Sequence, residues 1–325
     1  MMNHEISRRG FFKASCGVVA AAGTAGLFHR SAIAAEKRSR LPVGCRDVNL
    51  KLMGQPDCWS AMKLTGAECV EAVIREDLSL PDLFHPQRKY SAATAEGIQE
   101  LAADLKAARR RITALCMFNQ FEKRPEVEIQ WGAKVARVAE ALGAKVIRID
   151  LRAEKLPGDE FLRFSIDILK KLMAATESTG VAFGIENHGA TTNDPQFLGR
   201  LFAGVASQRL GLTLDIGNFY WFGHPLSKLY AICEEFAPRV FHTHCKSIRY
   251  PEDQRETQRP MGWEYAQRRC PLYEGDIDYG RVVKILRSAG YSGDLCVEDE
   301  SLARFPAEER PMVLTKEIAM LKALG

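Results

Sequence analysis

Several features that would assign this chain to a common class of binding protein are missing from its sequence. Its 45 Lys and Arg residues nearly balance its 41 Asp and Glu residues, and the net charge of +4 does not indicate a nucleic-acid partner. No Gly-rich loop that would cradle a phosphate group is apparent. The nine cysteines are scattered without a CxxC pair. Because Cys69, Cys116 and Cys296 lie in apolar strand-like runs, we expect buried free thiols there.

The N-terminus also lacks an apolar run long enough for a stable transmembrane helix, which needs about 20 apolar residues. Residues 7–13, SRRGFFK, match a twin-arginine export signal, and the weakly apolar, Ala/Gly-rich residues 14–28 follow. Small residues at Ala32 and Ala34 suit a signal peptidase, so we expect cleavage after Ala34. The sequence thus predicts export by the twin-arginine machinery to the periplasm. A basic tail or an uncleaved anchor is the alternative.

Along residues 35–325, short β-rich runs alternate with longer segments of helical periodicity. Such alternation predicts parallel strands joined by right-handed crossovers, and the length is ordinary for one α/β barrel. We therefore predict a single-domain (β/α)8 TIM barrel. A doubly wound open sheet is the alternative, which the absence of a Gly-rich dinucleotide loop after the first strand disfavours. The expected strands are Val48–Met53, Ala67–Ala72, Ile112–Phe118, Lys145–Asp150, Val181–Glu186, Leu210–Asp215, Val240–Cys245 and Asp294–Glu298.

The last four of these strands carry a carboxylate or an imidazole at or next to their ends, at Glu186, Asp215, His244 and Glu298. Asp215 follows Glu186 by 29 positions, and His244 follows Asp215 by 29. Each step fits one strand-plus-helix unit, which needs roughly 30 residues. The carboxyl ends of barrel strands form the active-site face, so we expect the four side chains on one face.

Three carboxylates and one imidazole form a mostly hard, oxygen-rich set of ligands. Such a set suits Mn²⁺, Mg²⁺ or Co²⁺, with Zn²⁺ also feasible. Without a metal these like charges would be crowded, which costs energy or forces a proton onto one of them. A single strand-end acid would more often cap a helix or pair with an arginine. The four together predict a divalent metal centre.

One connection is unusually long. Residues 247–278, rich in Arg, Pro, Glu and Gln, lie between the predicted seventh strand and its helix, directly after the run that holds His244. Loops of this length in a compact domain are usually lids or binding loops. The alternative interpretation is a solvated excursion without a function.

The four strand-end runs resemble the motifs of the xylose isomerase-like barrel superfamily. This group includes sugar phosphate isomerases and epimerases, ketose 3-epimerases, hydroxypyruvate isomerases and inosose dehydratases. The segments GDIDY (275–279) and GYSG (290–293) resemble those that open the seventh helix and precede the eighth strand of these proteins. The resemblance covers roughly the whole mature chain, and it rests on IENHG (185–189), DIGN (215–218), HTHCK (242–246) and VE (297–298).

The resemblance to the ketose 3-epimerase branch implies roles for the four residues. It implies that Glu186 and Glu298 both bind the metal and act as catalytic bases. It implies that Asp215 and His244 serve purely as ligands.

Five further residues are candidates for binding the substrate. By strand alternation, His242 and Lys246 share the inward direction of His244. His242 could lie behind the ligands and Lys246 could contact a substrate oxygen, but a packed histidine and a solvated lysine are equally good interpretations. His188 and Asn218 flank two ligands and could bind hydroxyl groups. Arg249 could be the arginine that these epimerases carry beyond the histidine ligand.

Three positions depart from the ketose 3-epimerase pattern. Asn218 stands where a histidine is frequent, and Thr192 stands where an acid is found six residues after the first glutamate. Arg249 is one residue out of register with the expected arginine. These differences weaken an assignment to that branch.

We expect a metal-dependent isomerase or epimerase that transfers a proton through an enediolate of a sugar or keto-sugar. One glutamate would remove the proton, and the other would return one on the opposite face or at the neighbouring carbon. If the intermediate expels a hydroxyl or a glycosidic oxygen, the site is instead a lyase or dehydratase acting on a keto-sugar, an inosose or an oxidised glycoside. A non-catalytic periplasmic sugar-binding protein is the alternative of another class.

The export signal also bears on the substrate. Phosphorylated sugars are mainly cytoplasmic, so we expect an unphosphorylated small-molecule sugar. An apurinic endonuclease of the same superfamily is disfavoured, because it normally needs a trinuclear metal cluster and this chain has only seven histidines. The sequence leaves the oligomeric state open, including a homo-oligomer.

Overall fold

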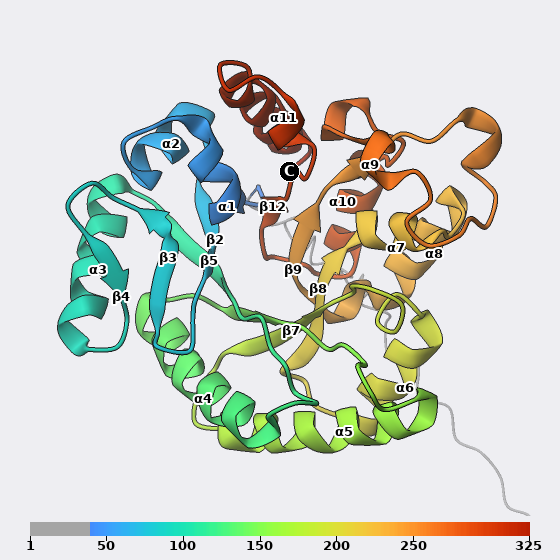
Figure 1. Cartoon of the computed structure of the whole chain (residues 1–325), viewed down its shortest axis with the longest axis horizontal. Coiled ribbons are helices and arrows are strands. Elements are labelled where there is room, and N and C mark those ends of the chain that lie inside the picture. Colours follow the sequence, from blue (N-terminus) through green and yellow to red (C-terminus); the bar gives the residue numbers. More distant parts are fainter. Residues whose placement is uncertain (1–39) are drawn as a thin grey trace, which may run out of the picture. The chain divides into compact units, whose positions relative to one another are not determined.

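Eight parallel strands close into a barrel in the order β1-β12-β9-β8-β7-β6-β5-β2 (Figure 1). The computed structural model describes residues 40–325. The predicted export signal and its cleavage after Ala34 lie outside these residues. The barrel strands are β1 (Val43–Arg46), β2 (Cys69–Val73), β5 (Arg111–Cys116), β6 (Val146–Ile149), β7 (Ala182–Glu186), β8 (Leu210–Asp215), β9 (Val240–Cys245) and β12 (Leu295–Val297). The predicted TIM barrel is confirmed.

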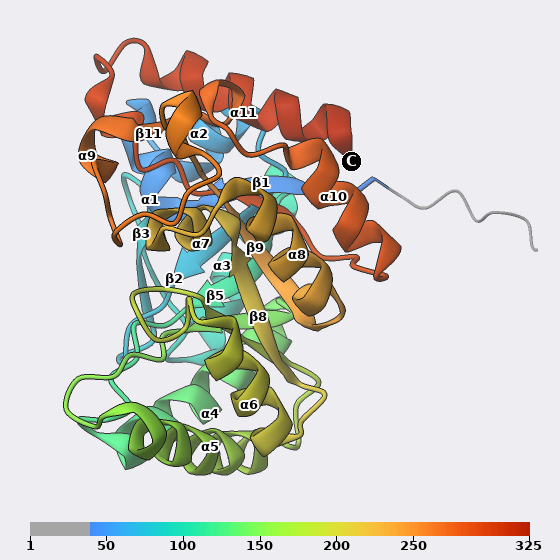
Figure 2. The same cartoon turned by 90° about the vertical axis from the view of Figure 1, so that its right-hand side faces the viewer.

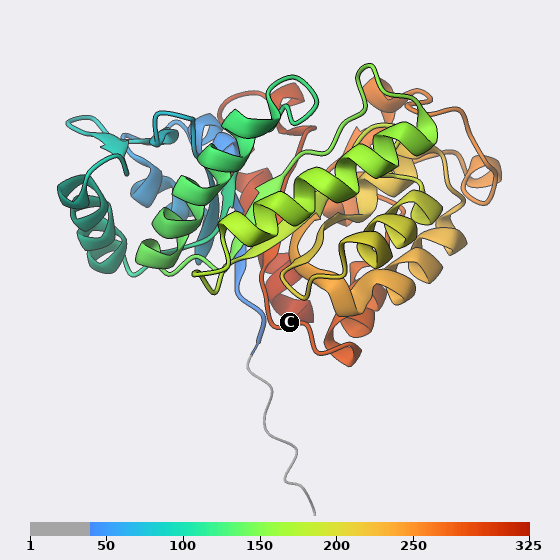
Figure 3. The ribbon, with the colours of Figure 1, turned by 90° about the horizontal axis from the view of Figure 1, so that it is seen from below.

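Helices follow most of the strands and cover the outside of the barrel. Helix α5 packs between α4 and α6 (Figure 3) and buries Phe161, Leu162, Ile168, Leu169 and Leu172 at helical spacing. The larger helices are α2 (Cys58–Thr65), α3 (Ala95–Ala108), α4 (Pro125–Leu142), α5 (Gly158–Ala175), α6 (Pro195–Val205), α7 (Ile216–Phe222), α8 (Leu226–Phe236), α10 (Tyr279–Ser288) and α11 (Arg310–Leu324). Within residues 40–325, none of the helices has the length and apolar character that crossing a membrane requires.

The first strand differs from the prediction. It runs from Val43 to Arg46, whereas the predicted Val48–Met53 falls in the short helix α1 (Asp47–Leu50) and the following 3₁₀ turn. The carboxylate of Asp47 accepts hydrogen bonds from the backbone N–H groups of Val48 and Val73, at 2.8 and 2.7 Å, which turns the chain out of the strand. Leu50 and Met53, three residues apart, are buried with helical spacing, whereas Val48 is exposed, so the alternation of apolar with polar residues misled the prediction.

A glycine explains why the strand lies where it does. A Cβ atom on Gly44 would stand 2.1 Å from the backbone oxygen of Cys69 on the neighbouring strand β2. Only glycine allows this close approach of the two strands. An apolar run without such a glycine could not occupy this place in the barrel.

The long connection after β9 contains several short helices and strands. Its ends pair as the antiparallel strands β10 (Ser247–Ile248) and β11 (Arg269–Cys270), with α9 (Tyr265–Arg268) before β11. The segment lies beside α7 (Figure 2). The buried guanidinium of Arg259 anchors it, because this group stacks on the rings of Tyr220 and Tyr250 and donates to the His224 carbonyl at 2.9 Å. A second excursion forms the hairpin of β3 (Ser79–Phe84) and β4 (Lys89–Ser91).

The cysteines of residues 40–325 are all free. Cys69, Cys116 and Cys296 are fully buried in strands, which confirms the expectation of buried thiols. Burial raises the pKa of the Cys116 thiol to about 12, so this group stays protonated at neutral pH.

Candidate metal centre

The four predicted ligands meet at the carboxyl end of the barrel. Glu186 ends β7, Asp215 ends β8, His244 lies near the end of β9 and Glu298 follows β12 directly. Asp215 and His244 are register partners across β8 and β9, which places their side chains next to each other. Each of the four offers a ligand atom within 4.8 Å of the others, and none is more than 7% exposed. Residues far apart in the sequence thus form one compact group.

The spacing and chemistry of this group fit one divalent cation. The Nδ1 atom of His244 lies 3.4 Å from Oε1 of Glu186 and 3.3 Å from Oε2 of Glu298. Two atoms that each stand about 2.1 Å from one ion are roughly 3.0–3.5 Å apart in octahedral or tetrahedral coordination. In addition, Oε2 of Glu186 and Oδ2 of Asp215 are buried, and each faces a cationic side chain, Arg148 and Lys246 respectively. Buried carboxylate oxygens of this kind need a cationic partner.

Three basic side chains offset the negative charge of the group. Nζ of Lys246 lies 2.9 Å from Oδ2 of Asp215 and 3.2 Å from Oε2 of Glu298. The guanidinium of Arg46 pairs with Glu298, and that of Arg148 pairs with Glu186. A bound cation would share these carboxylates with the ammonium of Lys246.

The pKa values reflect competition between burial and charge. Burial raises the pKa of Asp215 to about 6, although Lys246 opposes this shift. Burial also acts to raise the pKa of Glu298, but the charges of Lys246, His244 and Arg46 outweigh it and hold the pKa well below its usual value. Burial acts to lower the pKa of Lys246, and the neighbouring carboxylates reverse this, so the ammonium stays charged. The group therefore holds ionised side chains without exposure to bulk water.

Glu71, which the sequence reasoning did not identify, orients the histidine ligand. This residue lies in β2, is fully buried, and accepts a hydrogen bond from Nε2 of His244 at 2.6 Å. A histidine that binds metal through one ring nitrogen usually donates the other N–H to such an acceptor. Glu71 thus leaves Nδ1 of His244 directed at Glu186 and Glu298. The only signal in the sequence is that Glu71 lies inside the otherwise apolar strand β2. A carboxylate buried in this way needs a partner.

His242 lies behind the ligands and has no open side towards a substrate. It is fully buried, and its ring nitrogens lie 2.6 Å from Oε2 of Glu71 and 2.6 Å from Oδ1 of Asp294. Both nitrogens face carboxylates, so both donate and the ring is an imidazolium. Burial acts to lower the pKa of His242, but Asp294 and Glu71 raise it to about 9. A buried line of charged groups therefore runs to the metal centre through Asp294, His242, Glu71 and His244.

Two other candidates lie beside Glu186. The side-chain amide of Asn218 donates to Oε1 of Glu186 at 3.1 Å, and its backbone N–H donates to Asp215, which caps α7. Nδ1 of His188 lies 2.7 Å from Arg152, and burial together with this positive charge lowers the pKa of His188 to about 4. His188 is therefore neutral and accepts a hydrogen bond.

Thr192 stands where an acid would be expected from the resemblance, and it has a structural role here. Its hydroxyl accepts from the backbone N–H of His188 at 2.8 Å and donates to the His188 carbonyl at 2.9 Å. Thr192 is fully buried. These bonds fix the turn that presents His188 beside Glu186.

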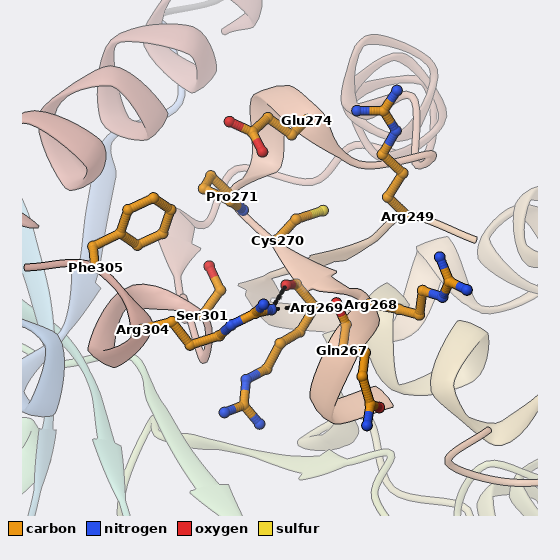
Figure 4. Close-up of a pocket in the computed structure, with 10 residues that line it drawn as sticks. All are labelled: Arg249, Gln267, Arg268, Arg269, Cys270, Pro271, Glu274, Ser301, Arg304 and Phe305. Carbon is orange, nitrogen blue, oxygen red and sulfur yellow. Dashed lines mark hydrogen bonds between the residues drawn. The ribbon is translucent and has the colours of Figure 1, made fainter. Parts of the chain in front are cut away.

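Arg249 is exposed and lines a different pocket, which Figure 4 shows. This pocket has a volume of about 370 Å³ and is formed largely by β11 and its neighbours. The guanidinium of Arg304 crosses it and donates to the carbonyl groups of Gln267 and Arg269, at 3.3 and 3.0 Å (Figure 4). Within residues 40–325, no hydrogen bond or ion pair joins the side chain of Arg249 to the four ligands.

The fold and the site define an α/β barrel with a candidate divalent-metal centre at the carboxyl ends of its strands. Residues 59–324 match the xylose isomerase-like TIM barrel family, and the chain belongs to this family. An inosose dehydratase of Erwinia tasmaniensis is 26% identical over 187 residues, which cover 53% of this chain and 62% of that protein. An uncharacterized protein of Methanocaldococcus jannaschii shares 23% identity over 49% of this chain and 48% of that protein. The chain thus spans about half the length of the curated relatives it matches.

Solved structures share the fold at low identity. The IolI protein with a bound zinc atom superposes with a TM-score of 0.66 and 18% identity, over 87% of this chain and 98% of that one. A xylose isomerase-like protein from Mycobacterium smegmatis in complex with magnesium superposes with a TM-score of 0.63 and 14% identity, over 87% of this chain and 97% of that one. The 3-keto-D-glucoside 4-epimerase YcjR of E. coli superposes with a TM-score of 0.61 and 14% identity, over 87% of this chain and 100% of that one. Two of these neighbours therefore hold zinc or magnesium.

Proposed function

We propose that this protein is a metal-dependent isomerase or epimerase that acts on an unphosphorylated sugar or keto-sugar. The observation that carries the proposal is the buried group of Glu186, Asp215, His244 and Glu298 at the active-site face of the barrel. Membership of the xylose isomerase-like family supports a metal-dependent enzyme that modifies sugars. The donor set suits Mn²⁺, Mg²⁺ or Co²⁺, and Zn²⁺ also fits it.

Glu186 and Glu298 are positioned to act as the two proton-transfer groups. A bound divalent ion would draw electron density from the substrate carbonyl and make the adjacent C–H more acidic. The barrel order places β8 and β9 between the strands that carry the two glutamates, so these approach the centre from different directions. One carboxylate takes the proton, and the other delivers one to the opposite face or to the neighbouring carbon. The first outcome is epimerisation and the second is isomerisation.

Other side chains of the site would bind the hydroxyl groups of the sugar. The ammonium of Lys246 has three N–H donors and three carboxylate partners, Asp215, Glu298 and the partly exposed Glu300. A substrate oxygen could replace Glu300 as the third acceptor. Asn218 and neutral His188 offer further N–H donors beside Glu186, because Nδ1 of His188 already accepts from Arg152 and its proton is therefore on Nε2. Glu71 and His242 would not touch the substrate, because both are fully buried behind His244.

A lyase or dehydratase is the second candidate, and the likeness to an inosose dehydratase favours it. Its substrate would be a keto-sugar, an inosose or an oxidised glycoside. The same glutamate would remove the proton, and the other would protonate a departing hydroxyl or glycosidic oxygen instead of a carbon. A periplasmic sugar-binding protein without catalysis is the alternative of another class. The predicted twin-arginine signal supports an unphosphorylated substrate in each case.

A solvent-deuterium experiment separates these functions. The Mn²⁺-loaded protein is incubated in D₂O with a panel of unphosphorylated keto-sugars, and products are followed by NMR and mass spectrometry. We expect deuterium at a sugar carbon without loss of any group, and no exchange by metal-stripped protein. Loss of water or of an aglycone would show a lyase instead. If the protein holds no divalent metal and substitutions of the four ligands leave sugar binding intact, the enzyme proposal must be abandoned.

A further inference from the structure

A small pocket opens beside the metal centre, past the ends of β5 and β6. It has a volume of about 190 Å³, and its lining includes Phe118, Asn119, Gln120, Asp150 and Arg152. A carboxylate oxygen of Asp150 lies within 4.8 Å of ligand atoms of Glu186 and His188. A molecule held at the metal centre could therefore reach this pocket.

Phe118 joins the pocket to the metal ligands through two arginines. The guanidinium groups of Arg46 and Arg148 lie 5.9 and 5.3 Å from the centre of the Phe118 ring. These are the arginines that pair with Glu298 and Glu186. Both arginines are buried, whereas Phe118 is 48% exposed. Part of the ring is thus left uncovered at the edge of the site, which is unusual for a large aromatic side chain.

The charged residues around the pocket are largely paired with each other. Lys123 lies 3.0 Å from Glu154, and Glu122 accepts the backbone N–H groups of residues 154–156 at 2.6–3.3 Å. Asp150 accepts from Arg148 at 3.0 Å. The pocket therefore does not present a strong charge of either sign, and an anion or a cation has no preferred partner there.

Besides these paired charges, the pocket is lined by the partly exposed ring of Phe118 and by planar polar side chains. Oδ1 of Asn119 is buried and accepts no hydrogen bond, and Oδ1 of Asp150 is held by a loose ion pair with Arg152, at 3.5 Å, so each can take a donor after a small adjustment. Arg152 adds N–H donors. A pyranose ring has an apolar C–H face that packs on an aromatic ring, with hydroxyl groups around its rim, so its chemistry matches this lining.

We infer that this pocket binds a second, neutral sugar ring, so that the substrate is a disaccharide or glycoside whose reacting sugar sits at the metal centre. This inference rests on the proposed function. The volume equals that of about six water molecules at about 30 Å³ each. It is large enough for one ring. Phe118 is the stacking residue and determines the preference for the longer substrate.

Ketoses with and without a second ring test the inference. D-Fructose is compared with lactulose, turanose and palatinose, each of which is fructose linked to a second sugar, and dissociation constants are measured by calorimetry on the Mn²⁺-loaded protein. We expect at least one disaccharide to bind tenfold or more tightly than D-fructose. Phe118→Ala should reduce this ratio to twofold or less, and Phe118→Leu should give an intermediate value. Phe305→Ala, in the pocket of Figure 4, is the matched control and should leave the ratio unchanged.

The outcomes separate this inference from the proposed function. If fructose binds in a metal-dependent way and all three disaccharides bind equally well, the second-ring pocket is disproved while the function stands. The same holds if Phe118→Ala keeps the full ratio. If neither fructose nor any disaccharide binds to the metal-loaded protein, both the function and the pocket are contradicted. Because Phe118 is half-exposed, its replacement should not unfold the chain, and thermal unfolding of the variants verifies this.

Discussion

Replacing Glu298 by glutamine is expected to lower the rate of deuterium exchange into a keto-sugar by at least about 10³-fold. General base catalysis alone contributes about 10²- to 10⁴-fold. Glu298 is also a proposed metal ligand, and its carboxylate lies 3.3 Å from Nδ1 of His244. Glutamine keeps the shape of the side chain but cannot accept a proton at neutral pH. The loss should therefore appear mainly in kcat, measured by NMR at saturating sugar.

Glu300→Gln is the matched control for this experiment. Glu300 is close in sequence and also contacts Lys246, at 2.7 Å, but its side chain is 41% exposed. An exposed ion pair contributes little, so the control should change the exchange rate by no more than about threefold. Comparable losses in both variants would point to a general disturbance around Lys246. Full activity of Glu298→Gln would refute its role as a base.

The second large effect is expected at Glu71. Its buried carboxylate faces His242, His244 and Arg46, at 2.6, 2.6 and 3.1 Å. Glu71→Gln would leave the buried cations His242 and Arg46 without their shared carboxylate, and breaking a buried charge pair costs about 3–5 kcal/mol. It would also release the ring of His244, and loss of such a supporting carboxylate lowers metal affinity about 10- to 100-fold. Urea unfolding and Mn²⁺ titration measure the two effects.

Glu68→Gln provides the comparison, because it removes a partly exposed carboxylate three residues earlier. Glu68 pairs with Arg40 at the surface, and this pair should contribute no more than about 1 kcal/mol to stability. Its metal affinity should equal that of the parent protein. If Glu71→Gln unfolds at the same urea concentration as Glu68→Gln and binds Mn²⁺ as tightly, Glu71 does not support the metal centre.

The barrel and the four ligands could be predicted because their signals are local. A strand followed by a helix repeats about every 30 residues, so Glu186, Asp215 and His244 recur at the same point of successive units. Their position at strand ends is sufficient to bring them to one face of a barrel. Glu298 follows the same rule after the long connection.

Two supporting residues, Glu71 and Arg46, could not be predicted, whereas His242 could be, from its position on the strand of His244. Glu71 meets His242 and His244 across 171 and 173 positions of sequence, and no periodic pattern links them. Arg46 could not be identified for another reason. The predicted first strand, Val48–Met53, begins after Arg46, whereas the observed strand β1 ends on it. Its true position depends on the close approach of Gly44 to Cys69, which becomes evident only when both strands are in place.

The metal content of the purified protein tests the central claim most directly. Asp215→Asn is the sharpest variant, because asparagine caps a helix as well as aspartate and should keep α7 intact while removing a charged ligand. After equilibration with Mn²⁺ and removal of free ions, elemental analysis should find one ion per chain in the parent protein and a clear loss in Asp215→Asn. A parent protein that retains no divalent ion, or a variant that retains it equally well, would contradict the assignment of these four residues as a metal centre.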